Sequence, residues 1–254
     1  MSNKLDGTVA LITGASSGIG EATAIMLAEQ GAAVAVAARR KDRLDELVKR
    51  IEDAGGKALA IEADMSDRAQ AEATVERTVE ALGRLDTLFN NAGVMLLGSA
   101  KHADVDDWER MVDINIKGLL YAAHAALPHL TAAAADSPRG VADLINTSSV
   151  AGRLARPGSA VYNLTKFGVT AFTDALRQEV NEKHVRVSAV EPGLVATELA
   201  THMNDRAQDA LKERLGHVEP LQSKDIAEIV SFIITRPKHV AINELLVRPT
   251  EQGS

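Results

Sequence analysis

Short apolar runs rich in β-branched residues alternate with longer stretches of helical periodicity along this chain of 254 residues. The helical stretches, rich in Ala, Leu and Glu, include Ile19–Gln30, Arg43–Ala54 and Gln70–Leu82. This alternation is typical of βαβ units and predicts a parallel sheet covered by helices on both faces, with right-handed connections. The expected strands are Val9–Thr13, Ala33–Ala38, Ala58–Ile61, Thr87–Asn90, Ala142–Thr147, Val185–Val190 and Glu244–Val247.

The sequence contains no recognisable linker or internal repeat, so a single domain over residues 1–254 is expected. The alanine run Ala132–Ala135 is predicted to end a helix before an exposed loop. The polar helical stretch Glu198–Val218 follows the sixth expected strand. Residues 197–218 could therefore form a lid over a substrate, and an ordinary surface helix is an equally good interpretation.

The composition argues against several classes of partner. A formal net charge of −7 provides no basic surface for nucleic acid or for an anionic membrane. No apolar run is long enough to cross a bilayer, and the N-terminus lacks the apolar core of a signal peptide. The chain has no cysteine, which excludes thiolate chemistry and agrees with a cytoplasmic location. We expect no metal site.

A glycine-rich turn, Thr13–Gly20, follows the first expected strand and leads directly into a helical pattern. Its three glycines allow a tight turn and the close approach of backbone to a ligand. The N-terminus of the following helix offers free N–H groups to a pyrophosphate. This context predicts a dinucleotide site, with a turn that serves packing alone as the alternative. The expected contacts are Gly14, Ser16, Ser17, Gly18, Ile19 and Gly20.

The end of the second expected strand indicates which dinucleotide binds. NAD sites usually carry a carboxylate here, whereas this chain has Ala38-Arg39-Arg40 and no acid at that point to repel a phosphate. Two guanidinium groups can bind a 2′-phosphate through charge-assisted hydrogen bonds, so NADP(H) is the predicted cofactor. Alternatively, Arg39 and Arg40 begin a solvated helix together with Lys41 and Arg43.

Tyr162 and Lys166 lie four residues apart, and Tyr162 follows Ser149 by thirteen residues. On a helix, residues four apart share one face. A cation beside a phenol lowers the phenol's pKa from its usual value of about 10, which suits proton transfer near neutral pH. The pair therefore predicts an acid–base site, although the spacing alone also fits a solvated helix face.

Together these motifs resemble the short-chain dehydrogenase/reductase family over essentially the whole chain. The resemblance implies a single-domain, Rossmann-type doubly wound parallel sheet of about seven strands. It also implies hydride transfer between NADP(H) and the carbonyl or alcohol of a small molecule. The matching segments are the turn Thr13–Gly20, Asn90-Asn91-Ala92-Gly93, Asn115, Ser149, Tyr162 with Lys166, and Pro192-Gly193 with Thr197.

A finer resemblance is to NADP-dependent reductases that include clavulanate-forming aldehyde reductases and serine-type 3-hydroxy-acid dehydrogenases. It rests on the segments Asn91–Gly98 and Glu191–Val195 and on the tail from His239 to Thr250. Glu191 departs from the small or neutral residue of the wider family and agrees with this subgroup. The implied substrate is an aldehyde or ketone, such as a clavulanate-type aldehyde or a 3-hydroxy or 3-oxo acid.

The family resemblance also implies a role for each catalytic residue. Ser149 would hold the substrate oxygen, with Ser148 as a competitor for that role. Tyr162 would protonate the oxygen, and Lys166 would favour the ionised tyrosine and bind the nicotinamide ribose. Asn115 would hold a water that links Lys166 to solvent, unless it simply bonds backbone within its helix.

Further cofactor contacts are implied by the same resemblance. Asp64, followed by Met65, corresponds to the residue that meets the adenine ring, with an exposed turn carboxylate as the alternative. Thr197 would meet the carboxamide, or else cap a helix. The other expected cofactor residues are Asn91, Ala92, Gly93, Pro192, Gly193 and Val195, together with Tyr162 and Lys166.

The substrate side is expected to be walled by Met95, Leu96, Gly152–Ser159 and a lid near Leu199–Leu215. Arg153 or Arg156 could bind a substrate carboxylate, and a surface position for either is an equally good interpretation.

The alternatives for function are a steroid or polyketide ketoreductase, a dehydratase or epimerase, and a non-catalytic NADP(H) sensor. The helical segments Trp108–Leu130 and Ala160–Lys183 resemble the subunit-packing helices of the family. A homotetramer or homodimer is therefore expected.

Overall fold

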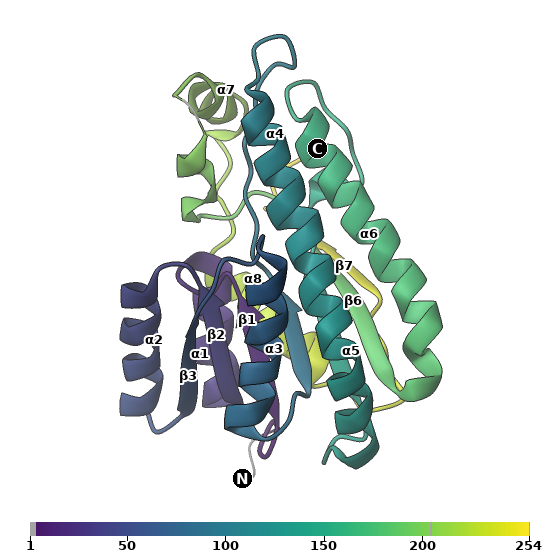
Figure 1. Cartoon of the computed structure of the whole chain (residues 1–254). Coiled ribbons are helices and arrows are strands. Elements are labelled where there is room, and N and C mark those ends of the chain that lie inside the picture. The colour runs from purple at the N-terminus through teal and green to yellow at the C-terminus, as the bar shows by residue number, and fades with distance from the viewer. Residues whose placement is uncertain (1–3, 204, 254) are drawn as a thin grey trace.

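The computed structural model describes residues 4–203 and 205–253 and contains a seven-stranded sheet in which every pair is parallel. The strands follow the order β3-β2-β1-β4-β5-β6-β7, so the order reverses between β1 and β4. The predicted α/β fold class is confirmed (Figure 1). The strands are β1 Val9–Thr13, β2 Ala33–Ala38, β3 Lys57–Glu62, β4 Thr87–Asn90, β5 Ala142–Thr147, β6 Val185–Pro192 and β7 Glu244–Val247.

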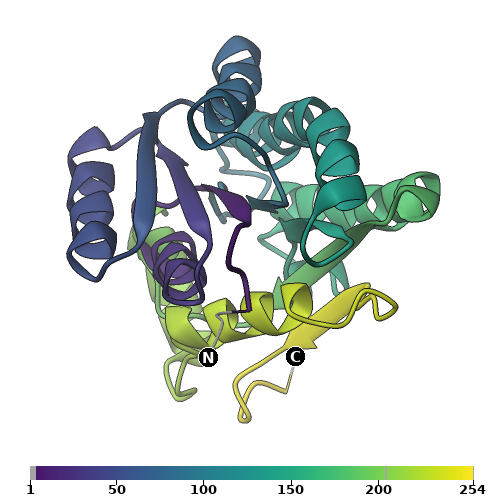
Figure 2. The same cartoon turned by 90° about the horizontal axis from the view of Figure 1, so that it is seen from below.

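Helices cover both faces of the sheet, as the view from below shows (Figure 2). Helices α1, α2 and α8 pack on one face and α3, α5 and α6 on the other. The α-helices are α1 Gly18–Glu29, α2 Lys41–Asp53, α3 Arg68–Leu82, α4 Val105–Val112, α5 Leu119–Asp136, α6 Ala160–Val180, α7 Asp205–Leu215 and α8 Ser223–Ile234. A π-helical segment, Asp113–Gly118, joins α4 to α5, and short 3₁₀ turns are Val150–Gly152, Asn181–Lys183 and Glu198–His202.

The central strands are buried on both faces, which explains why they read as continuous apolar runs. Every residue of β1 and β4 is buried. One apolar layer joins β1 and β2 to α1, α2 and α8, with Leu27, Leu44 and Ile233 among its members. The opposite layer includes Leu88 of β4 and Leu130 of α5.

Strand β6 is longer than the sequence predicts, because it ends at Pro192 instead of Val190. Glu191 pairs with Leu246 and Pro192 with Val247, so β7 continues the ladder by two residues. Proline cannot donate a backbone hydrogen bond, and its place at the last position of the strand is compatible with that restriction.

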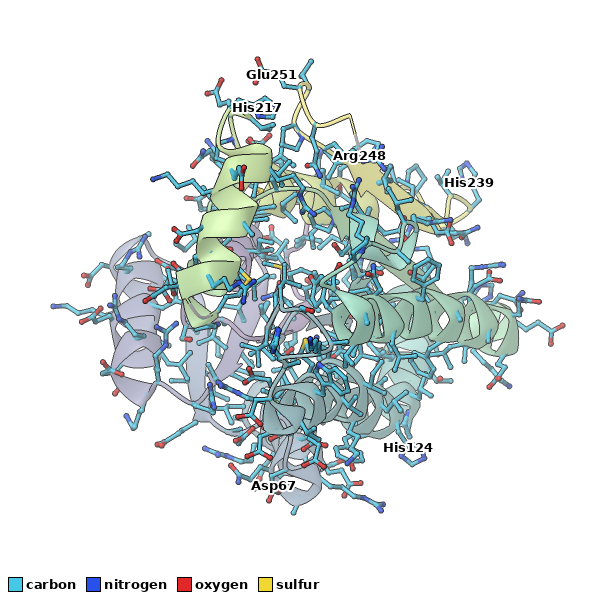
Figure 3. All side chains as sticks on the ribbon, turned by 90° about the horizontal axis from the view of Figure 1, so that it is seen from above. Asp67, His124, His217, His239, Arg248 and Glu251 are labelled. Carbon is cyan, nitrogen blue, oxygen red and sulfur yellow. The ribbon has the colours of Figure 1, made fainter. Side chains whose placement is uncertain are left out.

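The stretch that follows β6 is helical, as predicted, and consists of the turn Glu198–His202 and helix α7. Beyond α7, the chain returns towards the C-terminal residues, where the Glu219 N–H donates to Glu251 Oε2 at 3.4 Å. His217 and Glu251 lie at one edge of the molecule in the view from above (Figure 3). Within the described residues, we find no helix with the length and apolarity needed to span a membrane.

Candidate active site

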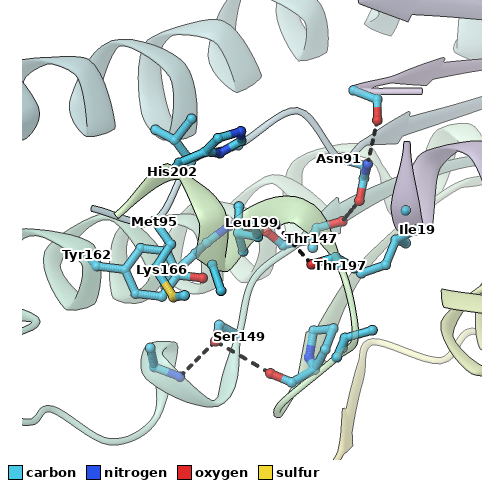
Figure 4. Close-up of a pocket in the computed structure, with 18 of the residues that line it drawn as sticks. Ile19, Asn91, Met95, Thr147, Ser149, Tyr162, Lys166, Thr197, Leu199 and His202 are labelled. Atoms are coloured by element: carbon cyan, nitrogen blue, oxygen red, sulfur yellow. Dashed lines mark hydrogen bonds between the residues drawn. The ribbon is translucent and has the colours of Figure 1, made fainter. Parts of the chain in front are cut away.

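A cavity of about 390 Å³ opens at the carboxyl ends of the parallel strands. This is where open α/β sheets usually bind ligands, beside the point at which the strand order reverses. Figure 4 shows Tyr162, Lys166 and Met95 gathered on one side of this space and Asn91 with Ile19 on the other. The predicted residues that line it are Gly14, Ser16, Ser17, Gly18, Ile19, Arg39, Arg40, Asp64, Met65, Asn91, Ala92, Gly93, Met95, Ser149, Arg156, Tyr162, Lys166, Pro192, Gly193, Val195 and Thr197.

The glycine turn after β1 packs closely against the residues that follow β4. Gly14 has a φ of +65°, and a Cβ added to it would lie 2.7 Å from the Cα of Ala92. The Thr13 hydroxyl accepts hydrogen bonds from the N–H groups of Asn91 (3.0 Å) and Ala92 (3.1 Å). Gly20 does not line the cavity; a Cβ there would lie 2.4 Å from the Gly14 carbonyl oxygen, so Gly20 serves the turn's own packing.

Helix α1 begins at this turn, and its first residues, Gly18 and Ile19, line the cavity. Ser17 is the N-cap residue, and its side chain makes no capping hydrogen bond to the helix. The positive end of the helix dipole and uncapped N–H groups suit a pyrophosphate. The turn and helix together fit a dinucleotide.

Arg40 lies at the rim of the turn, where its guanidinium donates to the hydroxyls of Ser16 (3.0 Å) and Ser17 (2.8 Å). It also forms a 2.9 Å ion pair with Glu198, and this contact lowers the pKa of the Glu198 carboxyl. The expectation that no acid stands at this point is therefore wrong. A carboxylate from the segment after β6 reaches the arginine, and no local sequence signal at β2 could reveal it.

Asp64 follows β3 at the predicted adenine end. Burial alone would raise its pKa, but hydrogen bonds from Ser66 and the charges of Arg39 and Arg110 lower the pKa below its usual value. Its Oδ1 accepts from the Ser66 N–H at 3.0 Å and from the Ser66 hydroxyl at 2.7 Å. Asp64 is therefore a charged, locally held carboxylate beside Arg39.

Tyr162 and Lys166 are buried near the start of α6, with the lysine Nζ 5.8 Å from the centre of the tyrosine ring. The Lys166 ammonium donates to the Thr147 carbonyl at 2.8 Å. Burial raises the pKa of Tyr162 to about 12 against an opposing hydrogen bond with Ser149. Burial also lowers the pKa of Lys166 to about 8.

The expected depression of the tyrosine pKa by Lys166 is therefore wrong for this geometry. Removal of the phenol from water disfavours the phenolate more strongly than the hydrogen bond with Ser149 favours it. At neutral pH Tyr162 is a phenol, which is the protonation state that a proton donor requires.

Ser148 and Ser149 have different partners at the end of β5. The Ser148 hydroxyl donates to the Lys166 carbonyl at 3.0 Å and lies 2.8 Å from the Thr170 hydroxyl. Both hydrogen-bond partners of Ser148 therefore lie on α6. The Ser149 hydroxyl accepts from the Ala151 N–H at 3.1 Å, and its own contact with the Pro192 carbonyl is 3.4 Å. The long second contact leaves the Ser149 proton the more available of the two for a substrate oxygen.

Asn115 is buried within the π-helical segment, a distortion often found at functional sites. Its Oδ1 accepts from the Val94 N–H at 2.8 Å, and its Nδ2 donates to the Val94 carbonyl at 2.9 Å and to Thr165 at 3.2 Å. Asn115 does not line the cavity itself. It ties α6 to the loop after β4, and its carbonyl would be 3.2 Å from a Cβ placed on Gly93.

The segment after β6 is held by a residue from the C-terminal tail. Gln252 Oε1 accepts from the Leu194 N–H at 2.8 Å, and it would be 2.3 Å from a Cβ on Gly193. Thr197 lines the cavity and also caps the next turn, accepting from the Leu199 N–H at 3.3 Å. Both interpretations of Thr197 are therefore compatible with the geometry.

The substrate end departs from the sequence expectations at two residues. Leu96 is buried in an apolar cluster with Tyr162, and Leu97 lines the cavity in its place. Arg153 lies outside the cavity lining, because Glu191 binds its Nε at 2.9 Å and Glu244 binds its Nη2. Of the two predicted arginines, only Arg156 faces the cavity.

Five further lining residues belong to the segment Leu199–Leu215 that was expected to wall the substrate side, although no motif marks them individually: Leu199, His202, Leu211, Arg214 and Leu215. Thr147 and Gln252 also line the cavity and were not predicted, because the segments that carry them lie far apart in the chain. In the part of the chain that the structure describes, no group of three or more His, Cys, Asp or Glu side chains could hold a metal ion.

Comparison with known proteins places this fold and site in context. A sequence profile described as "short chain dehydrogenase" matches residues 8–208. The chain is 39% identical over 253 residues to glycine betaine reductase ATRR of Emericella nidulans; the match covers 98% of this chain but only 19% of that much longer protein.

Two solved structures are similar over nearly their whole length. A closed form of serine dehydrogenase, complexed with NADP⁺, is 33% identical with a TM-score of 0.87, covering 97% of each chain. A 3-ketoacyl-(acyl-carrier-protein) reductase of Brucella melitensis, complexed with NADH, is 32% identical with a TM-score of 0.83, covering 96% of this chain and 98% of that one.

Proposed function

The chain belongs to the short chain dehydrogenase family, and from that membership we propose that it is an NADP(H)-dependent reductase of small aldehydes or ketones. The observation that carries the proposal is the buried Tyr162 phenol beside Ser149, on the cavity that also contains the glycine turn. The same site would run in the alcohol-oxidising direction. The proposed product of the forward direction is a primary or secondary alcohol.

Each catalytic residue has a role that its contacts support. Ser149 donates a hydrogen bond from its weakly bonded hydroxyl to the substrate oxygen and fixes the position of that oxygen. Tyr162, protonated at neutral pH, donates its proton to that oxygen as negative charge develops there. Lys166, charged below its pKa of about 8, adds positive charge beside the phenol. Asn115 holds the start of α6 in place through its hydrogen bond to Thr165. When bound, the nicotinamide supplies the hydride.

The preference for NADP(H) over NAD(H) rests on Arg39 and Arg40 at the end of β2. Arg40 already binds two hydroxyls and one carboxylate, which is the behaviour expected of a guanidinium that can bind a phosphate. Glu198 opposes that preference, because its charge would lie close to a 2′-phosphate. Relative kcat/KM values for NADPH and NADH decide the point, and equal values or a preference for NADH would contradict the proposal.

The substrate class, assembly and setting are parts of the same proposal. The likeness to serine dehydrogenase favours a carbonyl or hydroxy compound of the clavulanate-type or 3-hydroxy-acid kind. Leu120 of α5 and Leu164 and Phe167 of α6 are exposed apolar residues that favour a homodimer or homotetramer packed through these helices. We place the protein in the cytoplasm, with residues 1–254 as one domain and 197–218 as its lid.

The test is NADPH oxidation, followed by absorbance, against a panel of aldehydes and ketones. The proposal predicts turnover of at least one class of carbonyl compound that is lost in Tyr162→Phe. Failure of every carbonyl compound, with NADPH still bound, would favour a non-catalytic role.

A further inference from the structure

Two arginines from different elements face the substrate end of the cavity. Arg156 lies in the loop between the 3₁₀ turn Val150–Gly152 and α6, and Arg214 lies near the end of α7. Both line the cavity that contains Tyr162. The catalytic wall and the lid segment thus each contribute one guanidinium to the same space.

Neither guanidinium has a counter-ion among the described residues. Arg153, by contrast, is bound by Glu191 and Glu244, and Arg40 by Glu198. The Nη2 atom of Arg156 is buried and has no hydrogen-bond partner in the described structure. Buried donors without partners are rare in folded proteins, because the lost hydration is not replaced. Among the buried side-chain atoms without a partner in the described structure, Arg156 Nη2 is the one whose residue lines the cavity, where a ligand group could bind it.

The two positive charges also repel each other. The pKa of Arg214 is lowered by its partial burial and, in addition, by the charge of Arg156. An anion between the two guanidinium groups would remove this repulsion and satisfy the free Nη2. Leu154, Leu211 and Leu215 line the same cavity, and apolar lining lowers the local dielectric, which would strengthen such a contact.

The loop that carries Arg156 is held in place next to the catalytic tyrosine. The Arg156 N–H donates to Asn163 Oδ1 at 3.1 Å, and the Ser159 hydroxyl donates to the Arg156 carbonyl at 3.1 Å. Asn163 directly follows Tyr162 in α6 and also binds the carbonyls of Ala151 and Leu154. The backbone of Arg156 is therefore positioned by the same helix that positions the proton donor.

Helix α7, in contrast, has no buried residue. Leu211, Arg214 and Leu215 lie three and four residues apart on one helical face, and all three line the cavity. In Figure 1, α7 stands beyond the carboxyl ends of the strands and away from the sheet. An anion bound to Arg156 and Arg214 would connect this exposed helix to the rigid wall.

We propose that Arg156 and Arg214 form an anion-binding subsite that selects carbonyl substrates carrying a carboxylate group. This inference rests on the proposed reductase function and specifies its substrate. The carboxylate binds between the two guanidinium groups while the carbonyl oxygen lies at Ser149 and Tyr162. Substrate binding then holds α7 over the cavity.

The first test compares 4-carboxybenzaldehyde with methyl 4-formylbenzoate as substrates for NADPH oxidation. Wild type is expected to prefer the acid, and Arg156→Met or Arg214→Met should lower kcat/KM for the acid by roughly 10- to 100-fold while leaving the ester nearly unchanged. Lys212→Met, on the same helix but outside the cavity lining, is the matched control and should change neither. Equal loss for acid and ester, or no loss for either, would overturn the proposal.

A binding measurement separates this inference from the reductase proposal. Calorimetric titration of benzoate and of benzamide needs no turnover; wild type should bind benzoate more tightly, and each methionine variant should lose that difference. If neither aldehyde is reduced but benzoate shows this pattern, the function fails on these substrates and the subsite stands. Benzoate binding that is no tighter than benzamide binding, or that survives Arg156→Met, overturns the subsite. Arg156→Lys keeps the positive charge and is a more conservative change than Arg156→Met, so it tests whether the loss comes from misfolding. It should retain part of the preference for benzoate over benzamide.

Discussion

Helix α6 and helix α7 face the same cavity but are built in opposite ways. Helix α6 buries seven of its residues, Tyr162 and Lys166 among them, whereas α7 buries none. Side-chain hydrogen bonds fix α6 to β5, including one from Asn146 Nδ2 to the Thr173 hydroxyl at 2.9 Å. The half-exposed ion pair Arg40–Glu198 and the hydrogen bonds of Arg40 to Ser16 and Ser17 hold the segment that follows β6 to the glycine turn.

This difference separates the chemistry from the choice of substrate. A proton donor must be held within tenths of an ångström, and a packed helix supplies that accuracy. A lid must open for substrate and product, and an exposed helix with few buried contacts opens at low cost in free energy. Changes on α6 should therefore affect turnover and the stability of the fold, and changes around α7 should affect the affinity for substrate and cofactor.

The largest expected effect is on the α6 side. Tyr162→Phe should reduce kcat by at least about 100-fold, because general acid catalysis contributes roughly 10²–10⁴ to rate. NADPH affinity, measured by fluorescence titration, should stay close to wild type. Tyr121→Phe, in the other tyrosine of the chain, is the control and should keep its activity. Most of the activity surviving in Tyr162→Phe would contradict the proposed mechanism.

Lys166→Ala should show a somewhat smaller loss that affects two quantities. We expect kcat to fall by roughly 10- to 100-fold, since positive charge behind the phenol is lost, and NADPH to bind more weakly. Steady-state kinetics and a cofactor titration check both. If neither quantity changes, the dual role of Lys166 is wrong.

The same lysine should make stability depend on pH. Burial lowers its pKa from 10.5 to about 8, so between these values the unfolded chain holds the proton that the folded chain has released. Raising the pH through this window therefore increases the free energy of unfolding, by at most about 3 kcal/mol. Urea unfolding at pH 7 and pH 10 should show this gain in wild type relative to Lys166→Met.

Lys212→Met serves as the control for that experiment, because Lys212 is exposed on α7. The free energy of unfolding of Lys212→Met should rise between pH 7 and pH 10 by as much as that of wild type. At pH 10 the raised pKa of Tyr162 opposes part of this gain, because the unfolded tyrosine is about half ionised there, but this contribution is common to wild type and both lysine variants and cancels in their comparison. A wild-type gain no larger than that of Lys166→Met would mean that Lys166 is not desolvated in solution.

The smallest expected effect belongs to the lid side. Glu198→Gln should tighten NADPH binding by roughly 3- to 10-fold and leave NADH nearly unchanged, because it frees Arg40 for the 2′-phosphate. Stability should change little, since the pair is half exposed. Glu213→Gln, on α7, is the control. Weaker binding of NADPH by Glu198→Gln would show that Arg40 does not contact the phosphate.

Much of the fold could be predicted from the sequence, since strands buried on both faces leave uninterrupted apolar runs between turns. Five of the seven strands match the predicted bounds without change, including β1 and β5. Strand β6 was predicted too short because only pairing with β7 extends it over Glu191 and Pro192. The π-helical segment around Asn115 leaves no periodicity that distinguishes it from an α-helix.

At the site, residue identities were easier to predict than environments. The sequence placed Tyr162 and Lys166 on one helix, but it could not tell how completely the fold removes them from water, which decides both pKa values. In the sequence, Arg153 and Arg156 are equivalent candidates. In the structure, Glu191 and Glu244, which are distant in sequence, form ion pairs with Arg153. Glu198 beside Arg40 and Arg214 opposite Arg156 were missed for the same reason.

The central claim is that this cavity brings a substrate carbonyl to the nicotinamide and to Tyr162 for direct hydride transfer. The most direct test is reduction of an accepted aldehyde with NADPH that carries deuterium at nicotinamide C4, followed by mass spectrometry of the product. The account predicts an alcohol with one deuterium on the former carbonyl carbon. An alcohol without deuterium would contradict it.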